Sequence, residues 1–406
     1  MKISSVYSGY IHASTGVASV LIAMDEGNWS DSGLKHRIFS IDNKGRRVAP
    51  KQCSPELLSQ KRVSYFKRCK LKGFRILSLF RQKFWKAAEH YNVFAVAYLS
   101  IFHKVRAFKL VKEFIADSSY NDFIIVHDIW SLLAFNSSEY DLKKVVFVIH
   151  GSDDPMSFVL KIFPKLEGSK FLSELSNDFT QCMHQLKSVV VLSAENKIKI
   201  NEQYKVKSSL ILNGIGDESY KLPIEDSLTV HMTGSICARK RQYLFVEVIN
   251  TLGFNFLKSN NVKVNFFGGG PDYNFLLSKV KEYGLSPWVI LHGDTEFPFK
   301  KYRLGDLILC ISTEEGLPVA LIEGLRAGCI PIVTNVGGCK LTTLNDNGLV
   351  LPSMSDDSVS LELRSLISML SKHNNRRKMG MNSVELFKKE FSNQKMVDEY
   401  AKEILA

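Results

Sequence analysis

The fold is decided by one stretch, residues 307–334, which reads LILCISTEEGLPVALIEGLRAGCIPIVT. Short apolar runs at 307–311 and 330–334 predict two buried strands. The roughly dozen residues between them predict a helix. The order strand, loop, helix, strand is typical of an α/β protein with a parallel sheet.

Two carboxylates, Glu315 and Glu323, flank the start of this predicted helix. Pro318 suits the first helical position, where a missing N–H costs nothing. The free amides and the positive end of the helix dipole then point back toward Glu315 and Gly316, where they attract phosphate or sugar oxygens. Glu323 lies one to two turns further along, among apolar residues. Its carboxylate is therefore expected to be partly buried and to need a partner, which a ribose diol would supply.

The spacing of the two acids resembles the E-x7-E signature of retaining glycosyltransferases of family 4, which share the two-domain GT-B fold. The resemblance implies that Glu315 lies beside the donor sugar and that Glu323 binds the ribose of the nucleotide. It also implies that backbone amides at Gly316, Leu317 and Val319 hold the sugar and phosphates. Taken alone, the spacing would favour a helix cap followed by a solvated helix residue, and the flanking motifs turn the balance toward the donor site.

Short β-rich runs alternate with helical stretches along the whole chain, which predicts parallel sheets covered by helices on both faces. The glycines at 214 and 216 suit a hinge between two such units. By resemblance to GT-B proteins, residues 1–215 form an acceptor-binding Rossmann-like domain and residues 216–381 a nucleotide-sugar-binding one. Residues 382–406 form a helix that crosses back to the first domain.

A glycine turn followed by cations comes after the first strand of the second domain. Gly234 precedes Lys240 by six residues, and this resembles the family's G-R-x5-K diphosphate clamp. Ser235 departs from the pattern because it carries no charge. Either Arg239 or Arg241 therefore reaches the phosphates, or the clamp holds one cation and one hydroxyl. A solvated basic turn is the alternative interpretation.

Three further positions complete the predicted site. Gly268 belongs to a glycine run that resembles the loop beside the nucleotide base, although a plain tight turn explains it equally well. His150 closes a strand at the carboxyl edge of the first sheet, where such folds bind ligands, and it resembles the family's active-site histidine. Gly16 lies in a loop resembling the one that faces the phosphates and the acceptor. Asp153 and Asp154 are predicted to form an ordinary turn, so no metal or other cofactor is expected.

Charge and composition bound the remaining possibilities. The 406 residues carry a net charge of +12, and ten cations with no acid lie between Glu56 and Glu89. This Lys61–Lys86 segment has apolar residues at helical spacing, so it fits either a membrane-surface helix or a solvated helix packed on the domain. No nucleic-acid module accompanies the charge. Seven scattered cysteines without a C-x-x-C pair argue against disulfides or structural zinc.

Taken with these features, the resemblance implies a retaining, metal-independent hexosyltransferase-type enzyme. It would move a sugar from a UDP or GDP donor to a glycan or lipid-linked acceptor in cell-surface polysaccharide synthesis of the O-antigen, capsule or lipopolysaccharide type. The absence of a secretory leader pattern predicts a cytoplasmic protein, with the basic segment placing it on the inner face of the cytoplasmic membrane. The alternative is a nucleotide-sugar-binding partner subunit without transferase activity, favoured by Ser235. A fold-sharing epimerase or phosphorylase is the third possibility.

Overall fold

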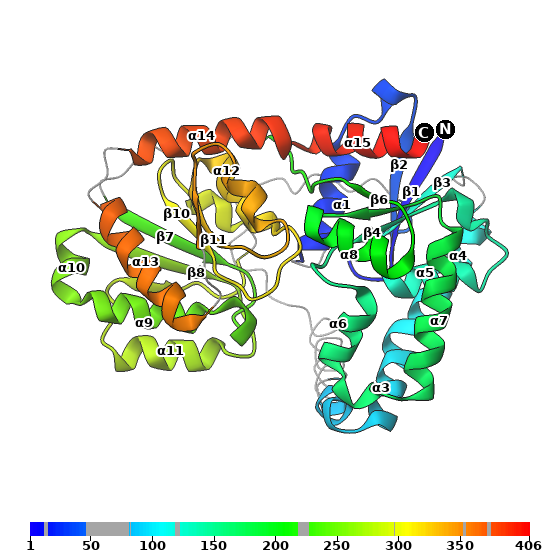
Figure 1. The fold of residues 1–406 in the computed structure, drawn as a ribbon, viewed down its shortest axis with the longest axis horizontal. Coiled ribbons are helices and arrows are strands. Elements are labelled where there is room, and N and C mark those ends of the chain that lie inside the picture. Colours follow the sequence, from blue (N-terminus) through cyan, green and yellow to red (C-terminus); the bar gives the residue numbers. More distant parts are fainter. Residues whose placement is uncertain are drawn as a thin grey trace, which may run out of the picture.

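The computed structural model describes residues 1–11, 15–45, 81, 83–117, 122–217, 227–295, 297–351, 355–371 and 375–406. These residues form two α/β domains side by side, each built on a six-stranded parallel sheet (Figure 1). Of the predicted amphipathic segment Lys61–Lys86, all but residues 81 and 83–86 lie outside the described ranges.

The N-terminal sheet has the strand order β2-β1-β3-β4-β5-β6. Its central strands are apolar and buried on both faces, as in β4, because helices cover both sides. The strands are β1 (Lys2–Tyr7), β2 (Lys35–Ser40), β3 (Phe123–Val126), β4 (Val145–Ile149), β5 (Ser188–Val191) and β6 (Ser208–Leu210). The helices are α1 (Gly16–Glu26), α3 (Asn92–Leu99), α4 (Val105–Ala116), α5 (Ile129–Asn136), α6 (Pro155–Ile162), α7 (Lys170–Gln185) and α8 (Ala194–Tyr204).

The C-terminal sheet has the order β12-β11-β10-β7-β8-β9. The apolar runs at 307–311 and 330–334 form β10 and β11, as predicted. The strands are β7 (Leu228–Thr233), β8 (Val262–Phe267), β9 (Val289–Leu291), β10 (Leu307–Cys310), β11 (Ile330–Thr334) and β12 (Leu349–Leu351). The helices are α9 (Gln242–Leu252), α10 (Phe254–Ser259), α11 (Tyr273–Glu282), α12 (Val319–Ala327) and α13 (Asp356–Ser371).

Shorter helical turns join these elements. One of them, η2 (Ser100–Lys104), is a π-helical turn inserted between α3 and α4. The 3-10 turns are η1 (Ser30–Ser32), η3 (Leu142–Lys144), η4 (Pro164–Leu166), η5 (Ala238–Lys240), η6 (Pro298–Lys301) and η7 (Cys339–Thr343).

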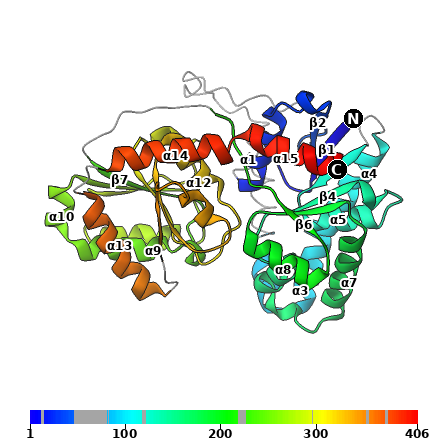
Figure 2. The ribbon, with the colours of Figure 1, turned by 45° about the horizontal axis from the view of Figure 1, so that its top comes forward.

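Two consecutive helices, α14 (Arg376–Glu390) and α15 (Asn393–Leu405), run across both domains (Figures 1 and 2). The helical conformation is interrupted between them, and α15 begins after Ser392, whose side chain accepts a hydrogen bond from the Lys395 amide. There the interdomain linker meets the break, because Ile215 donates to Phe391 O and accepts from the Asn393 amide. Helix α15 buries Met396, Val397, Tyr400 and Ile404 in a core shared with Ile3, Val20 and Met24 of the N-terminal domain.

Each sheet has a point where the strand order reverses, and ligands of open α/β sheets bind beside such points, at the carboxyl ends of the strands. In the C-terminal domain the reversal lies between β7 and β10, and in the N-terminal domain between β1 and β3. The loops after β7 and β10 contain Ser235, Arg239, Lys240, Glu315 and Gly316, whereas His150 follows the neighbouring strand β4 and Gly268 the neighbouring strand β8. No helix in the described ranges combines the length and apolar character that crossing a bilayer requires.

Candidate active site

The loop after β7 brings two cations to the first carboxylate of the signature. Lys240 Nζ forms an ion pair with Glu315 Oε1, and Arg239 NH1 lies 3.1 Å from the same oxygen. Burial alone would lower the pKa of Lys240, but the charges of Cys310 and Glu315 outweigh it and the pKa is raised. Lys240 is therefore a fixed positive charge within the site.

Arg239, and not Arg241, is the arginine that joins Lys240 at Glu315. The Arg239 side chain also donates to the Glu314 carbonyl. Arg241 has a left-handed backbone, with φ of 57°, and its guanidinium turns away to Asp356 at 2.9 Å. Ser235 is exposed, and its carbonyl accepts a hydrogen bond from Gln242. Of the two arginines that the sequence offered, the structure brings Arg239 to Glu315 and turns Arg241 away to Asp356.

Glycines let the backbone loops of this domain approach one another closely. A Cβ at Gly268 would lie 2.2 Å from the Gly234 carbonyl oxygen, and both residues have positive φ. A Cβ at Gly234 would stand 3.5 Å from Lys240 Nζ. The loops after β7 and β8 therefore pack backbone against backbone at Gly268, and a side chain there would force them apart.

Helix α12 begins beside Glu315 without a side-chain cap. The prediction that Pro318 occupies the first helical position is wrong by one residue. Pro318 is the N-cap, with ψ of 122°, and Val319 is the first helical residue. Its ring still fits, because the N-cap amide makes no intrahelical bond. The uncapped amides at the start of the helix thus remain available to an anion.

Glu323 lies within α12 and is half-buried. Burial raises the pKa of its carboxyl to about 7, against a smaller lowering by Arg326. Within the described part of the chain its carboxylate accepts no hydrogen bond from another side chain. The group is desolvated and has hydrogen-bonding capacity to spare, so a ligand that donates to it would be favoured.

Two stacked histidines, His127 and His150, lie at the edge of the N-terminal sheet that faces the C-terminal domain. His150, directly after β4, places Nε2 2.9 Å from Nδ1 of His127, which follows β3. The ring centroids are 5.2 Å apart. Burial lowers the pKa of His150 to about 4 and lowers that of His127 well below its usual value. Both rings are therefore neutral at pH 7, and the hydrogen bond fixes their orientation.

The two domains touch through the backbone at the site. A Cβ on Gly316 would lie 1.9 Å from the His150 carbonyl oxygen, so only glycine fits there. Gly16 begins α1, and a Cβ on it would be 4.0 Å from a methyl of Val319. The N-terminal ends of α1 and α12 thus lie near each other, on either side of the domain boundary.

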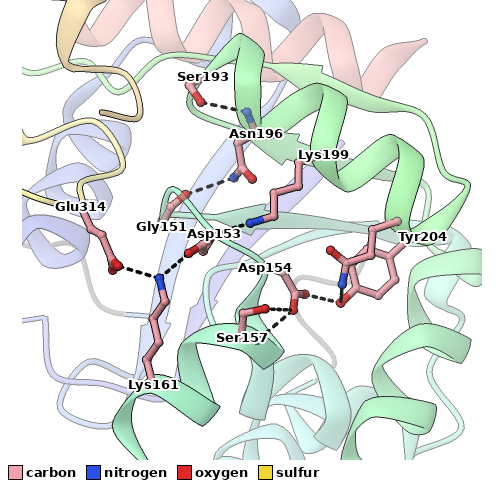
Figure 3. Close-up of polar contacts among 11 residues, drawn as sticks. Gly151, Asp153, Asp154, Ser157, Lys161, Ser193, Asn196, Lys199, Tyr204 and Glu314 are labelled. Carbon is pink, nitrogen blue, oxygen red and sulfur yellow. Dashed lines mark hydrogen bonds and ion pairs between the residues drawn. The ribbon is translucent and has the colours of Figure 1, made fainter. Parts of the chain in front are cut away.

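Asp153 and Asp154 form polar contacts within the protein (Figure 3). Asp153 pairs with Lys161, at 2.5 Å, and with Lys199. Asp154 caps α6 by accepting from the Ser157 amide at 2.9 Å, and Tyr204 donates to its other oxygen. Among the described residues, no group of three or more His, Cys, Asp or Glu side chains is arranged to hold a metal ion.

A cavity of about 520 Å³ opens at the domain boundary. Glu314, Glu315, Gly316 and Arg239 line it from one domain, and His150 and Asp153 from the other. The remaining described wall comes from the N-terminal domain. Besides His127 and Asp128, it contains residues that the sequence did not single out, including Trp85, Leu99, His103, Ile129, Trp130, Phe158, Val159, Ile162 and Phe163. Lys240 and Glu323 are not part of this wall.

Comparison with known proteins bears on the second domain above all. Residues 217–384 match the family model "Glycosyl transferases group 1". A 114-residue stretch is 28% identical to a poly(glycerol-phosphate) alpha-glucosyltransferase of Bacillus subtilis (strain 168), covering 27% of this chain and 17% of that one. A 132-residue stretch is 30% identical to the capsular polysaccharide biosynthesis glycosyltransferase CapH of Staphylococcus aureus, covering 32% and 34%. The chain thus spans about a third or less of these relatives' lengths.

The fold matches solved structures over the whole chain. Anabaena HepE in complex with UDP superimposes with a TM-score of 0.63 at 13% sequence identity, covering 99% of each chain. Two facing six-stranded Rossmann-like domains of this kind are the GT-B fold. The second domain thus resembles group 1 glycosyl transferases in sequence, and the whole chain shares its fold with the solved structure.

Proposed function

We propose that this protein is a retaining glycosyltransferase that moves a sugar from a nucleotide-diphosphate donor to a hydroxyl of a glycan or lipid-linked acceptor. The observation that carries the proposal is the convergence of Lys240 and Arg239 on Glu315. This cluster lies beside the uncapped start of α12, and His150 stands across the domain boundary. Cations, helix amides and a carboxylate in one place suit a diphosphate joined to a sugar.

In this proposal the predicted donor-binding residues of the second domain act together. Glu323 accepts from the ribose diol, and the amides of Gly316, Leu317 and Val319 hold the sugar and phosphates. Lys240 and Arg239 leave Glu315 in part and neutralise the diphosphate, whose negative charge grows as the glycosidic bond breaks. The leaving diphosphate takes the proton of the attacking hydroxyl, which approaches the same face of the sugar. The two side-chain cations supply the charge that a metal would supply, so we propose transfer without a metal ion.

We further propose a role in cell-surface polysaccharide synthesis, in the cytoplasm and against the inner face of the cytoplasmic membrane. Support for the role comes from the relatives, one of which is named for capsular polysaccharide biosynthesis. Support for the location comes from the ten cations between Glu56 and Glu89. Each cation near an anionic surface contributes about 1 kcal/mol, and salt weakens it. Charge reversal at Lys67, Arg68 and Lys70 should release the protein from anionic vesicles.

A panel of UDP and GDP sugars tests the reaction. We expect one donor to be hydrolysed or transferred in excess chelator, detected by mass spectrometry, with the anomeric configuration of the donor kept in the product by NMR. Inversion of that configuration would refute the retaining mechanism. Nucleotide binding without turnover of any donor would instead favour the partner subunit that lacks transferase activity.

A further inference from the structure

The cavity at the domain boundary has a polar end and an apolar end. At the polar end, Asp153, Glu314 and Arg239 surround Glu315 and Gly316. Helix α6 leads away from this end toward α3, which lies below it in Figure 1. The apolar end is formed by side chains of these helices, of α5 and of the residues beside them, namely Trp85, Leu99, Ile129, Trp130, Phe158, Val159, Ile162 and Phe163.

Among the described residues, Asp128 and His103 are the polar side chains beside the apolar end, and the first is fully engaged while the second is uncharged. Each carboxylate oxygen of Asp128 accepts two hydrogen bonds, all from Ser8 and Ser131, at 2.8 to 2.9 Å. Burial lowers the pKa of His103 to about 4, so its ring is neutral, and the ring lies 5.5 Å from that of Trp130. This wall therefore does not match a sugar, which needs many hydrogen-bond partners when it is desolvated.

We propose that the acceptor is an amphiphile whose reacting hydroxyl belongs to a polar head and whose apolar chain or ring occupies this end of the cavity. The inference rests on the proposed function, because the shared cavity is what links the apolar wall to Glu315. It narrows the acceptor from glycans in general to those that carry an apolar group close to the reacting sugar. Methylene groups buried there should tighten binding by about fourfold each until the cavity is filled.

Intrinsic fluorescence gives a binding assay that needs no catalysis. Trp85 and Trp130 line the cavity, whereas Trp29 packs beneath α15 and Trp288 stacks on Phe254 in the other domain. Methyl, butyl, hexyl and octyl β-glucoside are titrated below the micelle concentration of the octyl compound. Affinity that rises with chain length supports the proposal, and equal affinity for the methyl and octyl compounds overturns it.

Substitutions in the protein test whether the alkyl chain of the glucoside occupies the cavity. Ile162→Ser should weaken octyl glucoside binding at least tenfold, and Phe158→Ser gives a second test because Phe158 is 55% exposed and dispensable for packing. Leu361→Ser, at a 68% exposed leucine on α13, is the matched control and should leave binding unchanged. Equal loss in all three variants would mean adsorption elsewhere on the surface, and the proposal would fall.

Transfer assays separate this inference from the proposed function. If donor is turned over and octyl and methyl acceptors show the same KM, the apolar subsite is refuted and the transferase stands. If chain-length-dependent binding persists while no donor is turned over, the subsite stands and the transferase is refuted. A KM that falls with chain length in the wild type and not in Ile162→Ser supports both.

Discussion

Lys161 Nζ lies 2.6 Å from Glu314 Oε1, so an ion pair joins α6 of the first domain to the residue that precedes Glu315 in the second (Figure 3). Lys161 also contacts Asp153, in the loop after His150. One ammonium therefore bridges the loops that carry Glu315 and His150.

Removing the ion pair between Lys161 and Glu314 should weaken donor binding more than it lowers the stability of the fold. Lys161 is 44% exposed and Glu314 37%, so the pair itself contributes about 0 to 1 kcal/mol. We expect Lys161→Ala and Glu314→Ala each to raise the donor KM by roughly two- to fivefold. The double variant should be no worse than the poorer single one, because both remove the same contact. Strictly additive effects would show that the two side chains act separately. Lys165→Ala, an exposed lysine close to α6, is the control.

Lys240→Ala should lower kcat by about 100-fold or more, with a smaller change in KM, since the diphosphate gains charge in the transition state. Steady-state kinetics at saturating donor measure the effect. Lys258→Ala, at an exposed lysine of the same domain, controls for net charge. A kcat within twofold of the wild type would remove Lys240 from the chemistry and leave Arg239 as the cation to test.

Glu323 should make stability depend on pH. Its pKa is about 7 in the folded protein and 4.5 as an ordinary glutamate, so the folded state holds the proton more tightly. The resulting stabilisation is complete below pH 4.5 and is lost as pH rises through 7, amounting to at most about 3 kcal/mol. Glu323→Gln cannot ionise, so its unfolding free energy should fall less between pH 5 and pH 8 than that of the wild type. Chemical unfolding at pH 5 and pH 8 measures these free energies, and Glu202→Gln, at an exposed glutamate, is the control. Equal losses of unfolding free energy in the wild type and in Glu323→Gln would contradict the prediction.

The His127 and His150 rings should stay neutral across the physiological range. Their lowered pKa values follow from burial, and a proton added to either would be desolvated beside the other ring. In NMR spectra of histidine-labelled protein, we expect neither ring to titrate between pH 8 and pH 5. A midpoint near 6.5 for His150 would mean that water reaches the pair. His127→Phe removes the partner of His150 and identifies the two signals.

Local spacing was sufficient to predict the core of the second domain. The apolar runs before and after α12 predicted β10 and β11, because buried parallel strands are short and almost wholly apolar. Strand β12 was missed because it has three residues and only Leu351 is fully buried. Only the structure shows which arginine lies beside Lys240. Arg241 turns to Asp356 and Arg239 turns to Glu315, and the sequence does not distinguish the two.

The wall of the cavity could not be predicted because its members look like ordinary core. Ile162 and Phe163 have the apolar character of ordinary core residues, and only their position in the wall of the cavity that Glu315 also lines distinguishes them. Lys161 and Glu314 are 153 residues apart, so no local pattern connects them. His103 lies in the π-helical turn η2, and the sequence contains no signal that predicts such a turn.

The packing of α15 on the first domain has a consequence for synthesis on the ribosome. Strand β6 ends at Leu210, yet the core beneath α1 is closed by Tyr400 and its neighbours. At about 5 to 20 residues per second, roughly 10 to 40 s pass between translation of these two elements. During that interval the nascent domain exposes Ile3, Val20 and Met24, so chaperones that bind apolar segments have a long window in which to hold it.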